Sequence, residues 1–212
     1  MPKATQGPRT PPVPAGVHHG ICYQVIDIGT QPQAGNFPAR RKVKICWELP
    51  HERIDVQVNG VPRNLPRAVS KDYTLSTDKK ANLRHDLEAW RGRPFTQEEV
   101  DSFEVGNVIG ANCQLNVVHK PSADGSKVYA NVATIMPLPK GADRMKPENP
   151  TLLYDIPESL PVTFPEGMPE WIQNQIKNSD EYRDLLNPQP QKGPTDDQMA
   201  NITKEPQEDV PF

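Results

Sequence analysis

The sequence predicts a mainly β fold, in which five strands form a small barrel and one helix lies between the third and fourth strands. A short C-terminal helical hairpin and disordered tails complete the expected architecture. Five segments between residues 21 and 136 are β-branched or alternate polar with apolar residues, which is typical of strands. Between the third and fourth of them, the apolar period changes to that of a helix.

Proline sets the domain boundaries. The chain has 212 residues, of which only 35% are hydrophobic, and its 25 prolines cluster near both ends. Such ends cannot pack into a core. We therefore expect disordered tails at residues 1–15 and 187–212, a barrel domain at residues 16–141, and an extended arm with short helices at residues 142–186.

The first three strands are expected at residues 21–29, 40–49 and 67–76. The second alternates most clearly, and a tight-turn pair, Asn59-Gly60, precedes the third. The second strand carries Arg41, Val43, Ile45, Trp47 and Leu49 on one face, and Arg40, Lys42, Lys44, Cys46 and Glu48 on the other.

Helical spacing begins after Asp78 and is stopped by Gly92 and Pro94, and a second short helix is expected to start at Thr96. Residues 111–119 and 128–136 complete the set of strands. Beyond the barrel, residues 169–177 and 180–186 predict two short helices, which would pack either on the barrel or on a second subunit of a homo-oligomer.

Three strands, a helix and two strands follow the order of the OB-fold, a five-stranded Greek-key barrel. In that fold the loops after the first and fourth strands face the ligand. Here these loops are residues 30–39 and 120–127.

Charge is unevenly distributed along the chain. Residues 1–150 hold 20 Lys and Arg against 15 Asp and Glu, a balance of +5, whereas residues 151–212 hold 4 against 12, a balance of −8. A basic body with an acidic tail suits a polyanion binder whose tail competes for the same surface, although a mildly basic domain with a solvated tail would have the same balance.

Single-stranded nucleic acid requires cations for its phosphates and exposed aromatic faces for its bases. Cations at alternate positions of the second strand repel one another, which favours a ligand over a purely structural role. We expect Lys71 and Tyr73 on the same side, although Tyr73 could equally be a core residue; Trp47 and Trp90 are expected in the core. The candidate contacts are Phe37, Arg40, Arg41, Lys42, Lys44, Lys71, Tyr73, His119, Lys120 and Lys127.

Other functional classes lack support in the sequence. It contains no phosphate-binding loop, no His-Glu-x-x-His motif and no nucleophile elbow, so we expect neither an enzyme nor a cofactor. His18, His19, Cys22, Cys46 and Cys113 have no close-spaced ligand pair, and buried core thiols are favoured over a metal site. No apolar run reaches the ~20 residues of a membrane helix, and the N-terminus has no signal-peptide core, so a cytoplasmic protein is expected.

The last five residues are Glu208, Asp209, Val210, Pro211 and Phe212. Two acids followed by an aliphatic residue, proline and phenylalanine suit a partner with an apolar pocket and a basic rim, although such an acidic end could also simply be frayed. This tip resembles the C-terminal tip of bacterial and phage single-stranded DNA-binding proteins.

The body is also similar to phage-encoded single-stranded DNA-binding proteins with OB-folds, from ICYQVIDIG through YTLSTDKKANLRHDLEAWRGRPFT to PLPKG. The resemblance implies a protein that coats and protects single-stranded DNA in phage replication, recombination or repair. It also implies that the tip recruits other replication, repair and recombination proteins in the bacterial host cytoplasm. The alternatives are a phage structural or adaptor protein, and an RNA-binding or strand-annealing protein.

Overall fold

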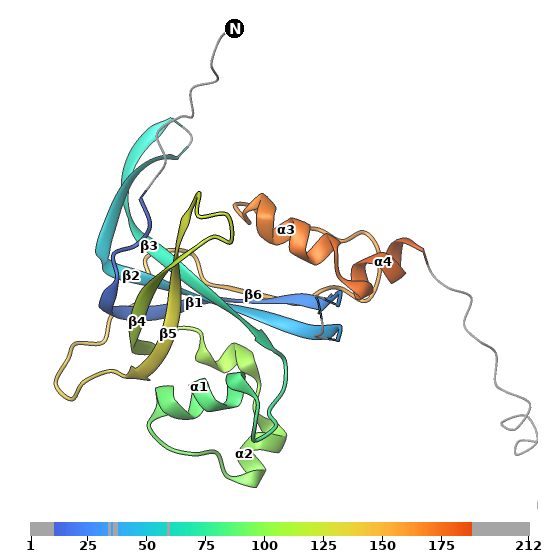
Figure 1. Cartoon of the computed structure of the whole chain (residues 1–212), viewed down its shortest axis with the longest axis horizontal. Coiled ribbons are helices and arrows are strands. Elements are labelled where there is room, and N and C mark those ends of the chain that lie inside the picture. The colour runs from blue at the N-terminus through green and yellow to red at the C-terminus, as the bar shows by residue number, and fades with distance from the viewer. Residues whose placement is uncertain (1–10, 34, 36–37, 59, 188–212) are drawn as a thin grey trace, which may run out of the picture.

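The computed structural model describes residues 11–33, 35, 38–58 and 60–187. In this part of the chain, one large sheet is covered by helices on two sides (Figure 1). The mainly β prediction is confirmed. No helix of the described residues combines the length and apolarity needed to cross a membrane.

The sheet has six strands and is antiparallel except for its last pair. Its path runs β3-β2-β1-β4-β5, and β6 adds to β1 in parallel. The sequence did not indicate β6, which lies in the arm expected to be extended. The bounds are β1 Gly16–Gln31, β2 Arg40–Val58, β3 Val61–Thr74, β4 Asn112–Pro121, β5 Val128–Pro137 and β6 Leu152–Tyr154.

The expected closed barrel is wrong. β3 and β5 form the two ends of the sheet path, and within the described residues no ladder joins them, so the sheet stays open. Helix α1, Asn82–Arg91, packs against both of these strands. Its buried side chains Leu83, Leu87 and Trp90 therefore cover the apolar interior at the place where β3 and β5 do not pair.

The helical segments after β3 lie where the sequence places them. Gly92 ends α1 in the left-handed region, with φ of 72°, which favours glycine. Helix α2, Gln97–Ser102, begins with a complete capping box between Thr96 and Glu99. A 3-10 turn, η1, follows at Val105–Val108.

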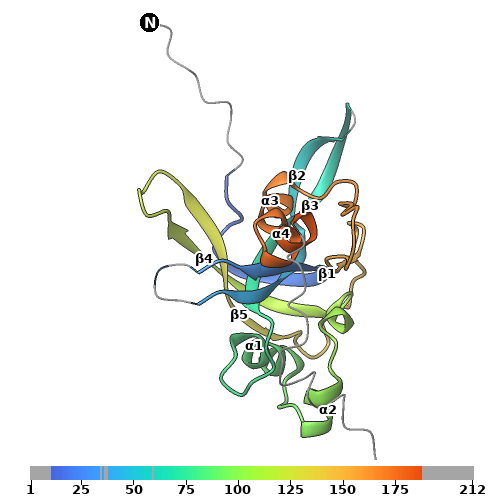
Figure 2. The same ribbon diagram turned by 90° about the vertical axis from the view of Figure 1, so that its right-hand side faces the viewer.

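Two apolar cores lie on opposite faces of β1 and β2. The inner core holds Trp47, whose ring centroid lies 5.8 Å from that of Trp90, and both indoles are buried as expected. The outer core is closed by α3, Glu170–Lys177, and α4, Asp180–Leu186, which pack on β1 of the same chain (Figure 2).

The boundary of the N-terminal tail differs from the prediction. Residues 11–15 pack on the sheet rather than lying outside it: Val13 is buried, and Arg67 donates to the carbonyl oxygen of Pro12 at 3.2 Å. The remaining tail residues, 1–10 and 188–212, lie outside the described residues.

Candidate nucleic-acid interface

A groove opens where β2 begins, β3 ends and α1 begins. Its volume is about 580 Å³. We call it the strand-end groove; it is lined by Arg40, Lys42, Lys71, Asp72, Tyr73, Thr74, Ser76, Asp78, Lys80, Ala81 and Asn82.

Local sequence explains why the groove forms there. Lys42 pairs with Thr74 at the end of the β2–β3 ladder. The chain then turns through Ser76 and Asp78, where the amide of Asp78 donates to the Ser76 hydroxyl at 3.2 Å. Helix α1 starts directly afterwards. No side chain of the described residues caps it, and its first turn carries no acid, so its N-terminal amides add positive potential at this end of the groove.

The balance of charge in the groove is positive. Among the described residues, Arg40, Lys42 and Lys80 line the groove without an ion pair, whereas Asp78 is its one lining carboxylate outside an ion pair. The other acid, Asp72, pairs with Lys44. The groove therefore offers three available cations to an anionic ligand.

Lys44 was predicted to contact nucleic acid, and the structure contradicts this. Its side chain is buried, with Nζ bonded to Asp72 and lying 4.7 Å from the ring centroid of Trp171 on α3. Period-two alternation predicts a solvent face for this side of β2, but α3 and the arm before it cover that face. Glu48 on the same face is also covered. Its carboxylate accepts hydrogen bonds from the amides of Glu148 and Asn149 at 2.8 and 2.9 Å.

Lys71 and Tyr73 were predicted to lie on the same face as the cations of the second strand. This prediction is also wrong. They pair with Ile45 and Val43, so they point to the inner side. Both donate to Oδ2 of Asp86 on α1, at 2.6 and 2.8 Å.

Tyr73 is therefore a core residue, the second of the two alternatives. Its side chain is only 2% exposed, so its ring offers no face to a base. Burial, together with the charge of Asp86, raises the pKa of its hydroxyl well above the ordinary value. Lys71 contributes to the groove wall, but its charge is offset by Asp86.

Arg41 lies among acids rather than in the groove. It donates to Asp27 at 2.6 Å, and this bond raises the pKa of its guanidinium. The pocket beside it is lined by Asp155, Glu158, Glu181 and Asp184, which makes it unsuitable for a phosphate. Phe37, the remaining candidate of this region, lies outside the described residues.

The β4–β5 hairpin forms a second basic surface. Lys120 pairs with Tyr129, and Lys127 precedes Tyr129 by two residues, so all three side chains share one face. All three are exposed, Tyr129 by 51%. We call these three residues the hairpin patch.

The turn of this hairpin is internally bonded. Asp124 accepts hydrogen bonds from the Ser122 and Ser126 hydroxyls, which lower its pKa to about 2. His119, also predicted, is exposed and makes a 2.8 Å hydrogen bond to the carbonyl oxygen of Val13, so it fixes the N-terminal segment.

The two basic surfaces share one side of the sheet but point in different directions: the ends of β1 and β2 point to the right, and the β4–β5 hairpin rises toward the top (Figure 1). In Figure 2 the β4–β5 hairpin and the paired ends of β1 and β2 both extend to the left of the sheet. Arg40 and Lys42 stand at the second of these places.

Sequence reasoning missed three features of this side. Lys80 and the start of α1 reach the groove through the β3–α1 connection. This loop has neither strand nor helix periodicity, so the sequence did not place it. Period two alone does not place Tyr129, because a register shift opposite Asn116 and Val117 lets both Val132 and Ile135 point inward although they are three residues apart. Trp171 is 52% exposed, but only the packing of α3 brings it next to Lys44.

The three cysteines are buried thiols, as expected. Burial raises the pKa of Cys46 to about 12 and that of Cys22 and Cys113 further, so none is a ready thiolate at neutral pH. Within the described ranges, no three His, Cys, Asp or Glu side chains gather as metal ligands.

Comparison with known proteins returned no match to a family model, to a curated protein or to a solved structure.

Proposed function

We propose that this protein binds single-stranded DNA without sequence specificity and without catalysis. The observation that carries the proposal is a set of three cations, Arg40, Lys42 and Lys80, which line the open strand-end groove and have no ion pair within the described part of the chain. Phosphates attract such cations with a strength that falls steeply with salt. The N-terminus of α1 in the same groove favours an anion as well.

The hairpin patch supplies what the groove lacks, an exposed aromatic face. A base stacked on Tyr129 would have Lys120 and Lys127 on the same face for its flanking phosphates. Stacking on an aromatic ring tolerates every base, since each has a π face. This combination supports binding that follows the backbone rather than the sequence.

The topology supports an OB-fold assignment for this binding domain. The path β3-β2-β1-β4-β5, with α1 between β3 and β4 in the chain, is the strand order of that fold, in an open rather than closed form. OB-folds commonly bind oligonucleotides through this strand face and its loops. Here the C-terminal helices cover part of that face, which shifts the proposed track toward the strand ends.

The wider role follows from the resemblance. It is the coating and protection of single strands in phage replication, recombination or repair, in the cytoplasm of a bacterial host. Residues 208–212 would recruit partner enzymes through their acids and Phe212. These residues lie outside the described ranges, so this part of the proposal rests on their chemistry alone.

Anisotropy of fluorescein-labelled oligo-dT tests the proposal directly. We expect saturable binding at low salt that weakens as salt rises, with similar affinity for mixed sequences of equal length. The absence of binding at low salt would refute it and favour the adaptor alternative. RNA oligomers and an annealing assay, run in parallel, separate the RNA-binding and strand-annealing alternatives.

Trp171 provides an intrinsic signal in the same titration. Trp47 and Trp90 are buried, so quenching by unlabelled oligo-dT should come mainly from Trp171. Trp171→Phe should remove most of the quenching while anisotropy still reports binding. Quenching that persists in this variant would show that the signal comes from Trp47 or Trp90 rather than from Trp171.

A further inference from the structure

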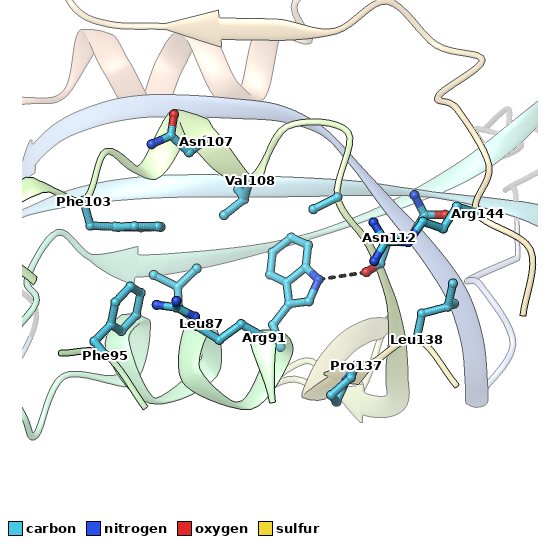
Figure 3. Close-up of a pocket in the computed structure, with 12 residues that line it drawn as sticks. Leu87, Arg91, Phe95, Phe103, Asn107, Val108, Asn112, Pro137, Leu138 and Arg144 are labelled. Carbon is cyan, nitrogen blue, oxygen red and sulfur yellow. Dashed lines mark hydrogen bonds between the residues drawn. The ribbon is translucent and has the colours of Figure 1, made fainter. Parts of the chain in front are cut away.

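An apolar pocket lies on the α1 side of the molecule, lined by residues that differ from those of the strand-end groove. It has a volume of about 400 Å³ and opens between α1, the segment around α2 and the start of β4 (Figure 3). Its walls include the rings of Trp90, Phe95 and Phe103 with Leu87 and Val108. This volume and lining suit an aromatic side chain with one or two small apolar neighbours.

The aromatic walls of the pocket are held in place. Trp90 donates its indole N–H to the carbonyl oxygen of Asn112 at 3.0 Å (Figure 3). Phe95 and Phe103 pack edge to face, with ring centroids 5.0 Å apart. The pocket is therefore preformed, which lowers the entropic cost of filling it.

Cations stand at the pocket's edge. Arg144 is exposed and makes no ion pair among the described residues, and its segment is fixed because Asn112 bonds both the amide and the carbonyl of Met145, at 2.9 Å each. Arg91 lies 4.4 Å from the centroid of Phe95 and shares the single carboxylate of Glu99 with Arg93. The edge is thus positive around an apolar interior.

The end of the same chain has the complementary chemistry. Residues 210–212 are apolar and include one aromatic ring, and Glu208 and Asp209 directly precede them. The 25 residues after Asn187 could span roughly 80 Å when extended, whereas a folded chain of this length has a radius of gyration of roughly 17 Å. The tip can therefore reach the pocket of its own chain.

We infer that residues 208–212 dock in this pocket of their own chain, with Phe212 among the aromatic walls and the two acids toward Arg144 and Arg91. The docked tip is sheltered, and a partner enzyme must compete for it. The inference is independent of DNA binding, because the pocket shares no lining residue with the strand-end groove.

The test compares ¹H–¹⁵N spectra of the full-length protein and its Phe212→Ala variant, without DNA. The indole N–H of Trp90 should shift between the two proteins, while that of Trp171, on the other side of the sheet, serves as the internal reference. A peptide of residues 204–212, added to the Phe212→Ala protein, should restore the Trp90 position. The same peptide with alanine for Phe212 should bind roughly 10- to 100-fold more weakly.

Charge is tested on the Phe212→Ala background. Arg144→Glu should weaken peptide binding several-fold, whereas Arg63→Glu, the same charge change on the exposed β2–β3 hairpin, should not. No shift at Trp90 together with no peptide binding would overturn the inference. So would peptide-induced shifts at Lys80 and Asn82 instead, which would put the tip in the strand-end groove. Shifts that grow with protein concentration would place the tip in a second copy and overturn docking within one chain.

Discussion

Replacing Lys42 and Lys80 together with alanine should flatten the salt dependence of DNA binding by a calculable amount. The strand-end groove and hairpin patch together offer five cations without an ion pair among the described residues: Arg40, Lys42, Lys80, Lys120 and Lys127. If each contacts one phosphate of a single strand, the slope of log K against log salt is about −0.7 × 5, or about −3.5. The double variant keeps three such contacts and a slope of about −2.1.

These slopes give a clear difference in a standard assay. Between about 50 and 200 mM salt, the unmodified protein should lose roughly 130-fold in affinity for oligo-dT, and the double variant only roughly 18-fold. Anisotropy titrations at four or five salt concentrations measure both slopes. The matched control is Lys140→Ala with Lys146→Ala, which removes two exposed lysines elsewhere and should leave the slope unchanged. An unchanged slope in Lys42→Ala/Lys80→Ala, or an equal loss in the control, would refute the placement of the site.

Three further predictions concern single contacts. Tyr129→Ala should weaken oligo-dT binding by about 1–3 kcal/mol in the same titration, and Tyr129→Phe should not, because stacking needs the ring and not the hydroxyl. Lys44→Ala should lower the free energy of unfolding, measured in urea, by about 2–3 kcal/mol, since it leaves Asp72 without its ion-pair partner. Lys44→Met keeps the buried stem and should therefore lose less stability. Equal losses of stability in the two variants would argue against this account. Although burial of Glu181 opposes ionisation, the hydrogen bonds from the amide and hydroxyl of Thr30 outweigh it and hold its pKa below 4.5. Its stabilising contribution is therefore fully present above pH 4.5 and is lost as the pH falls through the lowered pKa, so urea unfolding at pH 5 and pH 3 should show a smaller acid loss for Glu181→Gln than for the unmodified protein.

Local pattern was sufficient for most of the secondary structure. The alternation of residues 40–49, the helical spacing after Asp78 and the Thr96–Glu99 capping signal all correspond to β2, α1 and α2. These signals depend on neighbouring residues in the chain, so a single sequence carries them. β6 was not predicted, because its three residues show no period of their own and pair with a strand that is distant in the sequence.

The candidate site was predicted only in part. The strand-end position of Arg40 and Lys42 and the hairpin position of Lys120 and Lys127 could be read from strand order alone. Lys44 could not be judged, because the residue that covers it, Trp171, comes 127 positions later in the chain.

The sequence by itself determined most of the strands and helices, β6 excepted, because side-chain period and turn chemistry act over a few residues. It also determined the basic body and the acidic end, because charge is a property of composition. Only the tertiary structure decided which cations reach solvent. A charged face of a strand is open or buried according to what packs on it, and here α3 buries Lys44 while Lys42, two residues earlier, lines the groove.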